Sequence, residues 1–95
     1  MILHPVVYED SDFSVYIEDN TIGWILHCRV YHWTNVVYRK MLDTLALIIE
    51  SAPRNEVYAF SKNPKLTKFC EMFGMESIDT IQTEEGEGEL LCLTL

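Results

Sequence analysis

The alternation of apolar and polar positions predicts that the chain begins with two strands. Residues 6–17 alternate between the two kinds of side chain, which is typical of a strand with one face in solvent. Turn residues fill positions 18–21, and a longer β-rich run follows over 22–33. We expect the two runs to form an antiparallel hairpin. Because both faces of the second run are largely apolar, it should lie at the centre of the sheet.

A period of three to four residues then predicts an amphipathic helix. Thr34 or Asn35 can cap its start, and it should end before Pro53. Its apolar positions are Val37, Met41, Leu45, Ile48 and Ala52. Residues 56–60 form a short apolar run that predicts a strand. A strand, helix, strand order normally closes as a parallel crossover, so the sheet should be mixed.

The second predicted helix carries its own start and stop signals. Asn63 is suited to the N-cap and Pro64 to the first helical position, and Gly74 stands where the helix should end. Two last strands are expected over 76–81 and 89–95, joined by an acidic segment. The whole pattern reads ββαβαββ and predicts an α/β protein of the α+β kind, with two helices on a mixed, mostly antiparallel sheet.

Length and charge narrow the possibilities. With 95 residues, the chain should form a single domain over 1–95, because two cores would each be too small. Its net charge of -8 opposes the phosphate backbone, so we expect no nucleic-acid partner. The longest apolar run, 45–49, predicts no membrane segment, and the first residues lack the basic flank of a signal peptide.

The cysteines and histidines carry little metal or disulfide signal. Cys28, Cys70 and Cys92 cannot all pair within one chain, and their apolar neighbours indicate a reducing compartment, which favours the cytoplasm. His27 and His32 fall on opposite faces of one predicted strand, and no cysteine pair has ligand spacing, so we expect no metal site.

Charge is unevenly distributed along the chain. Lys62, Lys65 and Lys68 recur every three residues, and no cation follows them, whereas seven acidic residues do. This polarity has two interpretations: a contact with a basic partner, or a solubilising surface.

Residues 36–40 follow the predicted N-cap of the first helix. Backbone N–H groups at a helix N-terminus, with Arg39 and Lys40 nearby, could hold a phosphate, but a capped surface helix has the same pattern. Val36 and Val37 stand where a close approach of phosphate to the backbone would favour glycine. Cys70 lies on the apolar stripe of the second helix, either as core or as a reactive thiol.

Residues 63–76, preceded by the strand at 57–60 and followed by two strands, resemble the last third of GNAT-type N-acetyltransferases. The upstream order of elements also follows that family, so the resemblance covers most of the chain, while specific motif similarity is confined to 56–76. The resemblance implies acetyl-CoA as cofactor, with Asn63 near its pantetheine arm. The residues implied at the coenzyme are Val36, Val37, Tyr38, Arg39 and Lys40.

Three departures from the family pattern bear on activity. The family's first strand and helix pair are missing or reduced, residues 33–38 contain no glycine for a pyrophosphate loop, and Cys70 stands where the family often has a general-acid tyrosine. Cys70 is therefore the candidate catalytic residue, although a buried thiol would be a poor acid. The pattern is also similar to small acyltransferase-like proteins of tailed bacteriophages.

These observations support three hypotheses. The first is a phage-encoded interaction protein in the host cytoplasm, with a degenerate acyl-CoA site, no cofactor, and a host or virion protein as partner. It could also form a homodimer through a sheet face bearing Ile25, Tyr31 and Trp33. The second is an active acetyl-CoA-dependent N-acetyltransferase that works by positioning alone. The third is an acidic decoy that occupies a nucleic-acid-binding protein.

Overall fold

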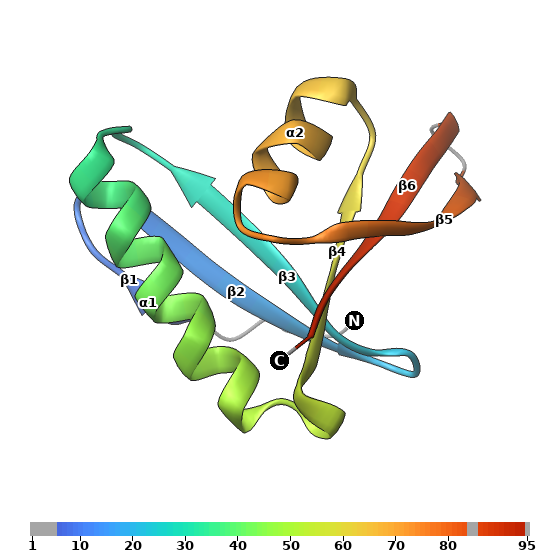
Figure 1. Ribbon diagram of the computed structural model, residues 1–95, viewed down its shortest axis with the longest axis horizontal. Coiled ribbons are helices and arrows are strands. Elements are labelled where there is room, and N and C mark those ends of the chain that lie inside the picture. Colours follow the sequence, from blue (N-terminus) through green and yellow to red (C-terminus); the bar gives the residue numbers. More distant parts are fainter. Residues whose placement is uncertain (1–5, 84–85, 95) are drawn as a thin grey trace.

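The computed structural model describes residues 6–83 and 86–94 and shows one sheet with two helices (Figure 1). The sheet has six strands in the order β1-β2-β3-β4-β6-β5. Only the β3–β4 pair is parallel, and the other pairs are antiparallel, so the mixed, mostly antiparallel sheet is confirmed. The elements are β1 (Val6–Glu9), β2 (Phe13–Asn20), β3 (Gly23–Val30), α1 (Asn35–Ser51), a 3₁₀ turn (Pro53–Asn55), β4 (Glu56–Ser61), α2 (Pro64–Met72), β5 (Glu76–Thr83) and β6 (Gly86–Thr94).

Both helices begin where their capping residues predict. The Thr34 hydroxyl accepts a hydrogen bond from the Val37 N–H at 3.1 Å, and the Asn63 Oδ1 accepts one from the Leu66 N–H at 2.8 Å. Gly74 has φ +89°, a left-handed conformation that ends the α2 segment without the strain a side chain would add. The local signals for both helices are therefore confirmed.

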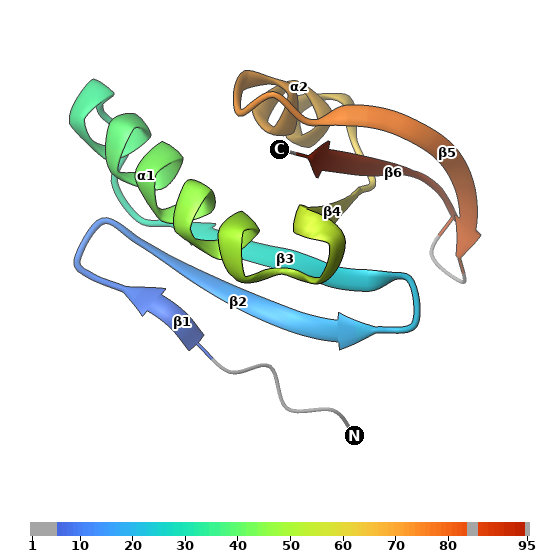
Figure 2. The same cartoon turned by 60° about the horizontal axis from the view of Figure 1, so that its bottom comes forward.

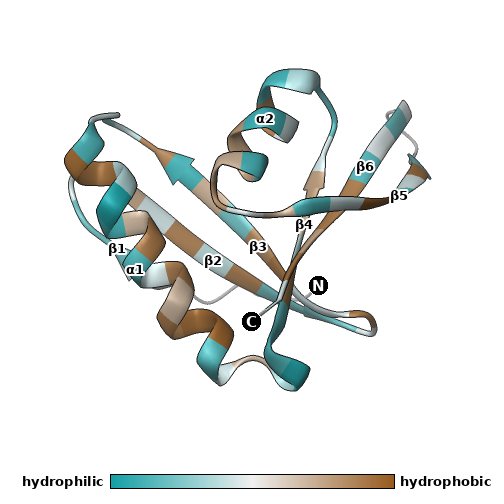
Figure 3. Ribbon diagram, in the orientation of Figure 1, coloured by the Kyte–Doolittle hydropathy of each residue, from teal (hydrophilic) through white to brown (hydrophobic). Residues whose placement is uncertain are grey.

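The core lies between α1 and the sheet. Figure 3 shows apolar and polar bands alternating along β2 and β3, as expected for strands with one covered face. Phe13, Val15 and Ile17 of β2 are buried under α1, together with the predicted apolar face of that helix. A smaller cluster beside it joins Ala59 and Leu91 to α2. Residues from both helices pack on the same face of the sheet, and no described helix covers the other, open face (Figure 2).

The prediction of a single strand over 6–17 is wrong, because the structure divides this segment into β1 and β2. The Asp10 carboxylate accepts hydrogen bonds from the N–H groups of Asp12 (2.7 Å) and Phe13 (3.1 Å), and this Asx turn reverses the chain. As a result Tyr8 lies opposite Val15 in an antiparallel ladder.

The long strand predicted over 22–33 is shorter than expected, and the hairpin turn before it lies further along the chain. Asn20 pairs with Gly23, so Thr21 and Ile22 form the loop. At the other end, the N–H groups of Tyr31 and His32 both donate to the Asp12 carbonyl, which ends β3 at Val30.

The sheet opens between its two parallel strands. β3 and β4 are paired only at Trp24 with Val57 and at Ile25 with Tyr58. By contrast, β2 follows β3 over eight register pairs, and β6 follows β4 over six. Beyond Ile25 and Tyr58 the two strands diverge (Figure 1), so the centre of the sheet is split at one end.

Candidate functional site: the cleft between β3 and β4

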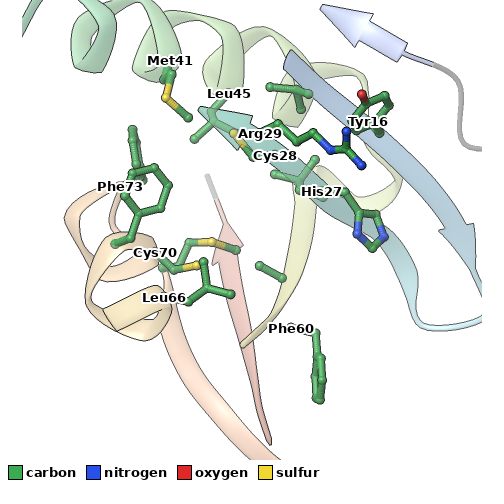
Figure 4. Close-up of a pocket in the computed structure, with 15 residues that line it drawn as sticks. Tyr16, His27, Cys28, Arg29, Met41, Leu45, Phe60, Leu66, Cys70 and Phe73 are labelled. Carbon is green, nitrogen blue, oxygen red and sulfur yellow. The ribbon is translucent and has the colours of Figure 1, made fainter. Parts of the chain in front are cut away.

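The split in the sheet leads into a cavity of about 710 Å³, which we call the strand cleft (Figure 4). Strands β2, β3 and β4 and both helices contribute to its walls. The lining residues are Val15, Tyr16, Leu26, His27, Cys28, Arg29, Met41, Leu45, Ala59, Phe60, Leu66, Phe69, Cys70, Phe73 and Met75. Most of these side chains are apolar, so the cleft is suited to an apolar group carried on a polar backbone.

The packing of the two helices accounts for the apolar walls of the cleft. Met41 and Leu45 come from the sheet-facing stripe of α1, whereas Cys70 and Phe73 come from α2 and its C-cap. Because both helices place apolar side chains beside the diverging strands, the gap is apolar on that side. Figure 4 shows Met41, Cys28 and Cys70 on different walls of one space.

The polar residues of the cleft come from the open face of the sheet. Side chains alternate along β3, so Leu26 and Cys28 face the helices while His27 and Arg29 face the other way. The His27 ring and the Glu18 carboxylate lie 3.0 Å apart. Arg29 forms no ion pair with any carboxylate in the described part of the chain. The sequence raised His27 only as a possible metal ligand, and it identified neither His27 nor Arg29 as a cleft residue.

Neither thiol in the cleft is prepared for nucleophilic or acid catalysis. Burial raises the pKa of Cys70, and the residue is only 7% exposed. Cys28 is open at the rim, but desolvation of its sulfur, with a smaller effect of Cys70, raises its pKa to about 11. Both therefore stay protonated at neutral pH. Within the described residues no group of three or more metal-ligating side chains converges.

The residues predicted to contact a coenzyme do not form one surface. Val37 is buried in the core, whereas Val36 is 67% exposed and Arg39 is exposed. Lys40 turns towards the β1–β2 loop, where its Nζ lies 2.7 Å from an Asp10 oxygen and 2.9 Å from an Asp12 oxygen.

These contacts neutralise Lys40, one of the two cationic side chains in the first turns of α1. The hydrogen bonds that Lys40 donates to the two carboxylates raise its pKa, and Lys40 together with the Tyr8 hydroxyl holds the pKa of Asp10 well below its usual range. The other cationic side chain, Arg39, is exposed and forms no ion pair with a described residue.

An aromatic cluster joins the start of α1 to α2. The Trp33 ring meets Phe69 at 5.4 Å and Tyr38 at 6.0 Å between centroids, while Tyr38 and Phe69 each pack on Phe73. The Tyr38 hydroxyl also donates to the Met72 carbonyl at 2.9 Å. We call Trp33, Tyr38, Phe69 and Phe73 the aromatic bridge. The expectation that Trp33 lies on the open sheet face is wrong, because it lies beyond β3 and packs on α2.

The side chain and the carbonyl of Asn63 both form hydrogen bonds at the start of α2. Its side-chain oxygen caps α2, and its carbonyl accepts hydrogen bonds from Ser61 and Thr67. It borders a separate, smaller hollow of about 330 Å³ rather than the strand cleft. The structure therefore brings Cys70 to the strand cleft and leaves Asn63 outside its walls.

The order of the strands, the two helices on one face and the split between parallel strands define a shortened GNAT-like fold. In a search of solved structures the chain is similar to a protein described as "Putative GnaT-family acetyltransferase from Bordetella pertussis", with a TM-score of 0.64 at 15% identity. That match covers 85% of this chain and 56% of the other, so the chain spans just over half the length of this structural relative. No family model and no curated protein matches the sequence. The comparison establishes the fold.

Proposed function

We propose that this chain is a non-catalytic protein with a GNAT-like fold, which acts by binding another protein and has lost acyl-CoA transfer. The observation that carries the proposal is the N-terminus of α1, where the resemblance implies that a coenzyme diphosphate would bind. Groups of the chain itself already interact with this terminus. The Thr34 hydroxyl accepts a hydrogen bond from the Val37 N–H, and Asp10 and Asp12 neutralise Lys40.

The chemistry of the strand cleft supports the same conclusion. An acetyl transfer that uses a general acid needs a group able to protonate the departing thiolate. Cys70 holds the position implied by the resemblance, but burial raises the pKa of its thiol, so it would donate its proton poorly. A phage origin and a host or virion partner stay predictions from the resemblance.

Titration calorimetry with acetyl-CoA tests this proposal directly. We expect no heat beyond dilution up to about 1 mM ligand, which would put any dissociation constant above the millimolar range. We also expect no acetyl transfer to a panel of amines with the protein in excess. Binding in the micromolar range, or transfer above the uncatalysed rate, would show that the proposal is wrong.

A second candidate function, acetyl-CoA-dependent N-acetyltransferase, is favoured by one observation: the split between β3 and β4, the gap that admits the coenzyme in active members of the family. Under this hypothesis Arg39 and the Val36 N–H at the start of α1 would hold the diphosphate, and the amine would attack a positioned thioester. Acetyl-CoA binding would then be lost in Arg39→Glu and retained in Lys65→Glu, which makes the same charge change on α2.

A further inference from the structure

The half of β3 beyond Ile25 is a central strand that has a neighbour on one side only. We propose that the strand cleft binds an extended segment of the partner protein, which adds to β3 as a strand. This inference rests on the proposed protein-binding function and names the chemistry of the partner: apolar side chains alternating with polar ones, and a carboxylate opposite Arg29.

The register of the hairpin shows which backbone groups are available. Asn20 and Gly23 flank a two-residue loop and form its closing pair, so every second pair after it is also hydrogen-bonded across the β2–β3 ladder. Those pairs use the backbone of Ile25, His27 and Arg29. The N–H and C=O groups of Trp24, Leu26 and Cys28 therefore point away from β2, towards β4 and the strand cleft.

The parallel pair of Ile25 with Tyr58 uses the Leu26 N–H, and the β3–β4 ladder ends there. The C=O of Leu26 and the N–H and C=O of Cys28 therefore have no partner in β4. An unpaired strand edge is a template for another extended chain, whose main-chain hydrogen bonds supply affinity. Here the edge lies inside the protein, so an incoming strand is enclosed by the walls of the cleft. The residues of β3 from His27 to Val30 are exposed, as expected for a strand that is still uncovered.

The two faces of β3 favour different side chains in the bound segment. On the helix side, a guest side chain meets Leu26, Met41 and Phe73, so every second guest residue should be apolar. On the open face, the guest passes Tyr16, His27 and Arg29. Since Arg29 has no ion pair to a described residue in a chain of net charge -8, a guest carboxylate is its natural counter-ion.

The test is a selection of random twelve-residue peptides displayed on a carrier, against the full chain. We expect the selected peptides to alternate apolar with polar residues and to include Asp or Glu. On binding, hydrogen exchange of the protein should slow at the amide of Cys28, and amides along the exposed edge of β5 should not change.

Two variants probe the edge and the cavity separately. Cys28→Pro removes an N–H that faces the cleft but leaves the β2 ladder intact, while Cys28→Trp fills the cavity from its rim. Each should weaken the selected peptides by at least about tenfold, which corresponds to roughly 1.4 kcal/mol. If the proline variant fails to fold, the tryptophan variant still decides, because Cys28 is exposed at the rim.

A matched pair of charge reversals tests the side-chain specificity. Arg29→Glu should weaken acidic peptides by roughly tenfold, because it places like charges together, whereas Lys65→Glu on α2 should leave affinity within about twofold. Peptides without alternation, peptides that protect β5, or a selection with no binders would each overturn the inference. So would a dimer of the wild-type chain that Cys28→Trp dissociates, since a second copy would then fill the cleft. These outcomes leave the proposed function standing, whereas acetyl-CoA binding would refute that function itself.

Discussion

Replacing Trp33 with alanine should lower the free energy of unfolding by about 3 kcal/mol. Trp33 is 45% exposed, so it buries about half of the roughly 200 Å² that a covered aromatic side chain hides. At about 25 cal/mol per Å², that area contributes approximately 2.5 kcal/mol. The edge contact with Phe69, whose centroid lies 5.4 Å away, supplies the remainder, since an aromatic pair adds about 0.5 kcal/mol or more beyond its area.

Urea unfolding followed by circular dichroism measures this loss, with the free energy taken from linear extrapolation. Val36→Ala is the matched control at the same end of α1: its side chain is 67% exposed, so the change should stay within about 0.5 kcal/mol. The double variant Trp33→Ala/Phe69→Ala should show a coupling energy of about 0.5–1.5 kcal/mol.

The result that refutes this reasoning is a Trp33→Ala protein as stable as Val36→Ala, with no coupling to Phe69. The aromatic bridge would then contribute nothing between the two helices. Trp33→Ala also has a functional expectation: it should gain no acetyl-CoA affinity, because the Thr34 cap and the pairing of Lys40 remain in place at the start of α1.

Three further changes test other parts of the structure. Lys40 lowers the pKa of Asp10, so the ionised carboxylate stabilises the folded protein above the unfolded pKa near 4. This stabilisation is lost as the pH falls below that value. Between pH 7 and pH 3 the urea midpoint should therefore drop more steeply in wild type than in Asp10→Asn. Asn63→Ala should lose about 1 kcal/mol by removing the α2 cap while leaving peptide binding at the strand cleft unchanged, as thermal melts and titration would show. Gly88→Ala should be destabilising by about 1–3 kcal/mol in the same melts, because its Cβ would collide with the Phe60 ring and with the Ser61 carbonyl at 2.9 Å.

The elements that could be predicted from sequence are those with local causes. α2 has a capping side chain, a proline at its first position and a glycine after its end, and each acts on neighbours within a few residues. The turn at Asp10 was missed although its signal is also local. Asp10, Ser11 and Asp12 are turn residues, but they continue an apolar and polar alternation, and alternation alone does not show where a strand reverses.

The strand cleft could not be located from sequence, since its cause is non-local. The largely apolar character of both of its faces correctly predicted that the run containing β3 lies at the centre of the sheet. The β3–β4 ladder, however, ends after Ile25, and no turn residue or proline in β3 marks that point in the sequence. Trp33 was misplaced for a related reason: the chain leaves β3 after Val30, which carries the ring to α2.

The cleft is itself an argument for a ligand. Continued pairing of β3 with β4 would add backbone hydrogen bonds, each with a net contribution of about 1 kcal/mol, and would cover an exposed half-strand. A chain of this size has a small free energy of unfolding, so leaving an unpaired edge at the centre of its sheet gives up a substantial part of it. The capped start of α1 disfavours a diphosphate-bearing ligand, whereas the unpaired edge and apolar walls suit an extended peptide. Both features therefore agree with the proposed protein-binding function.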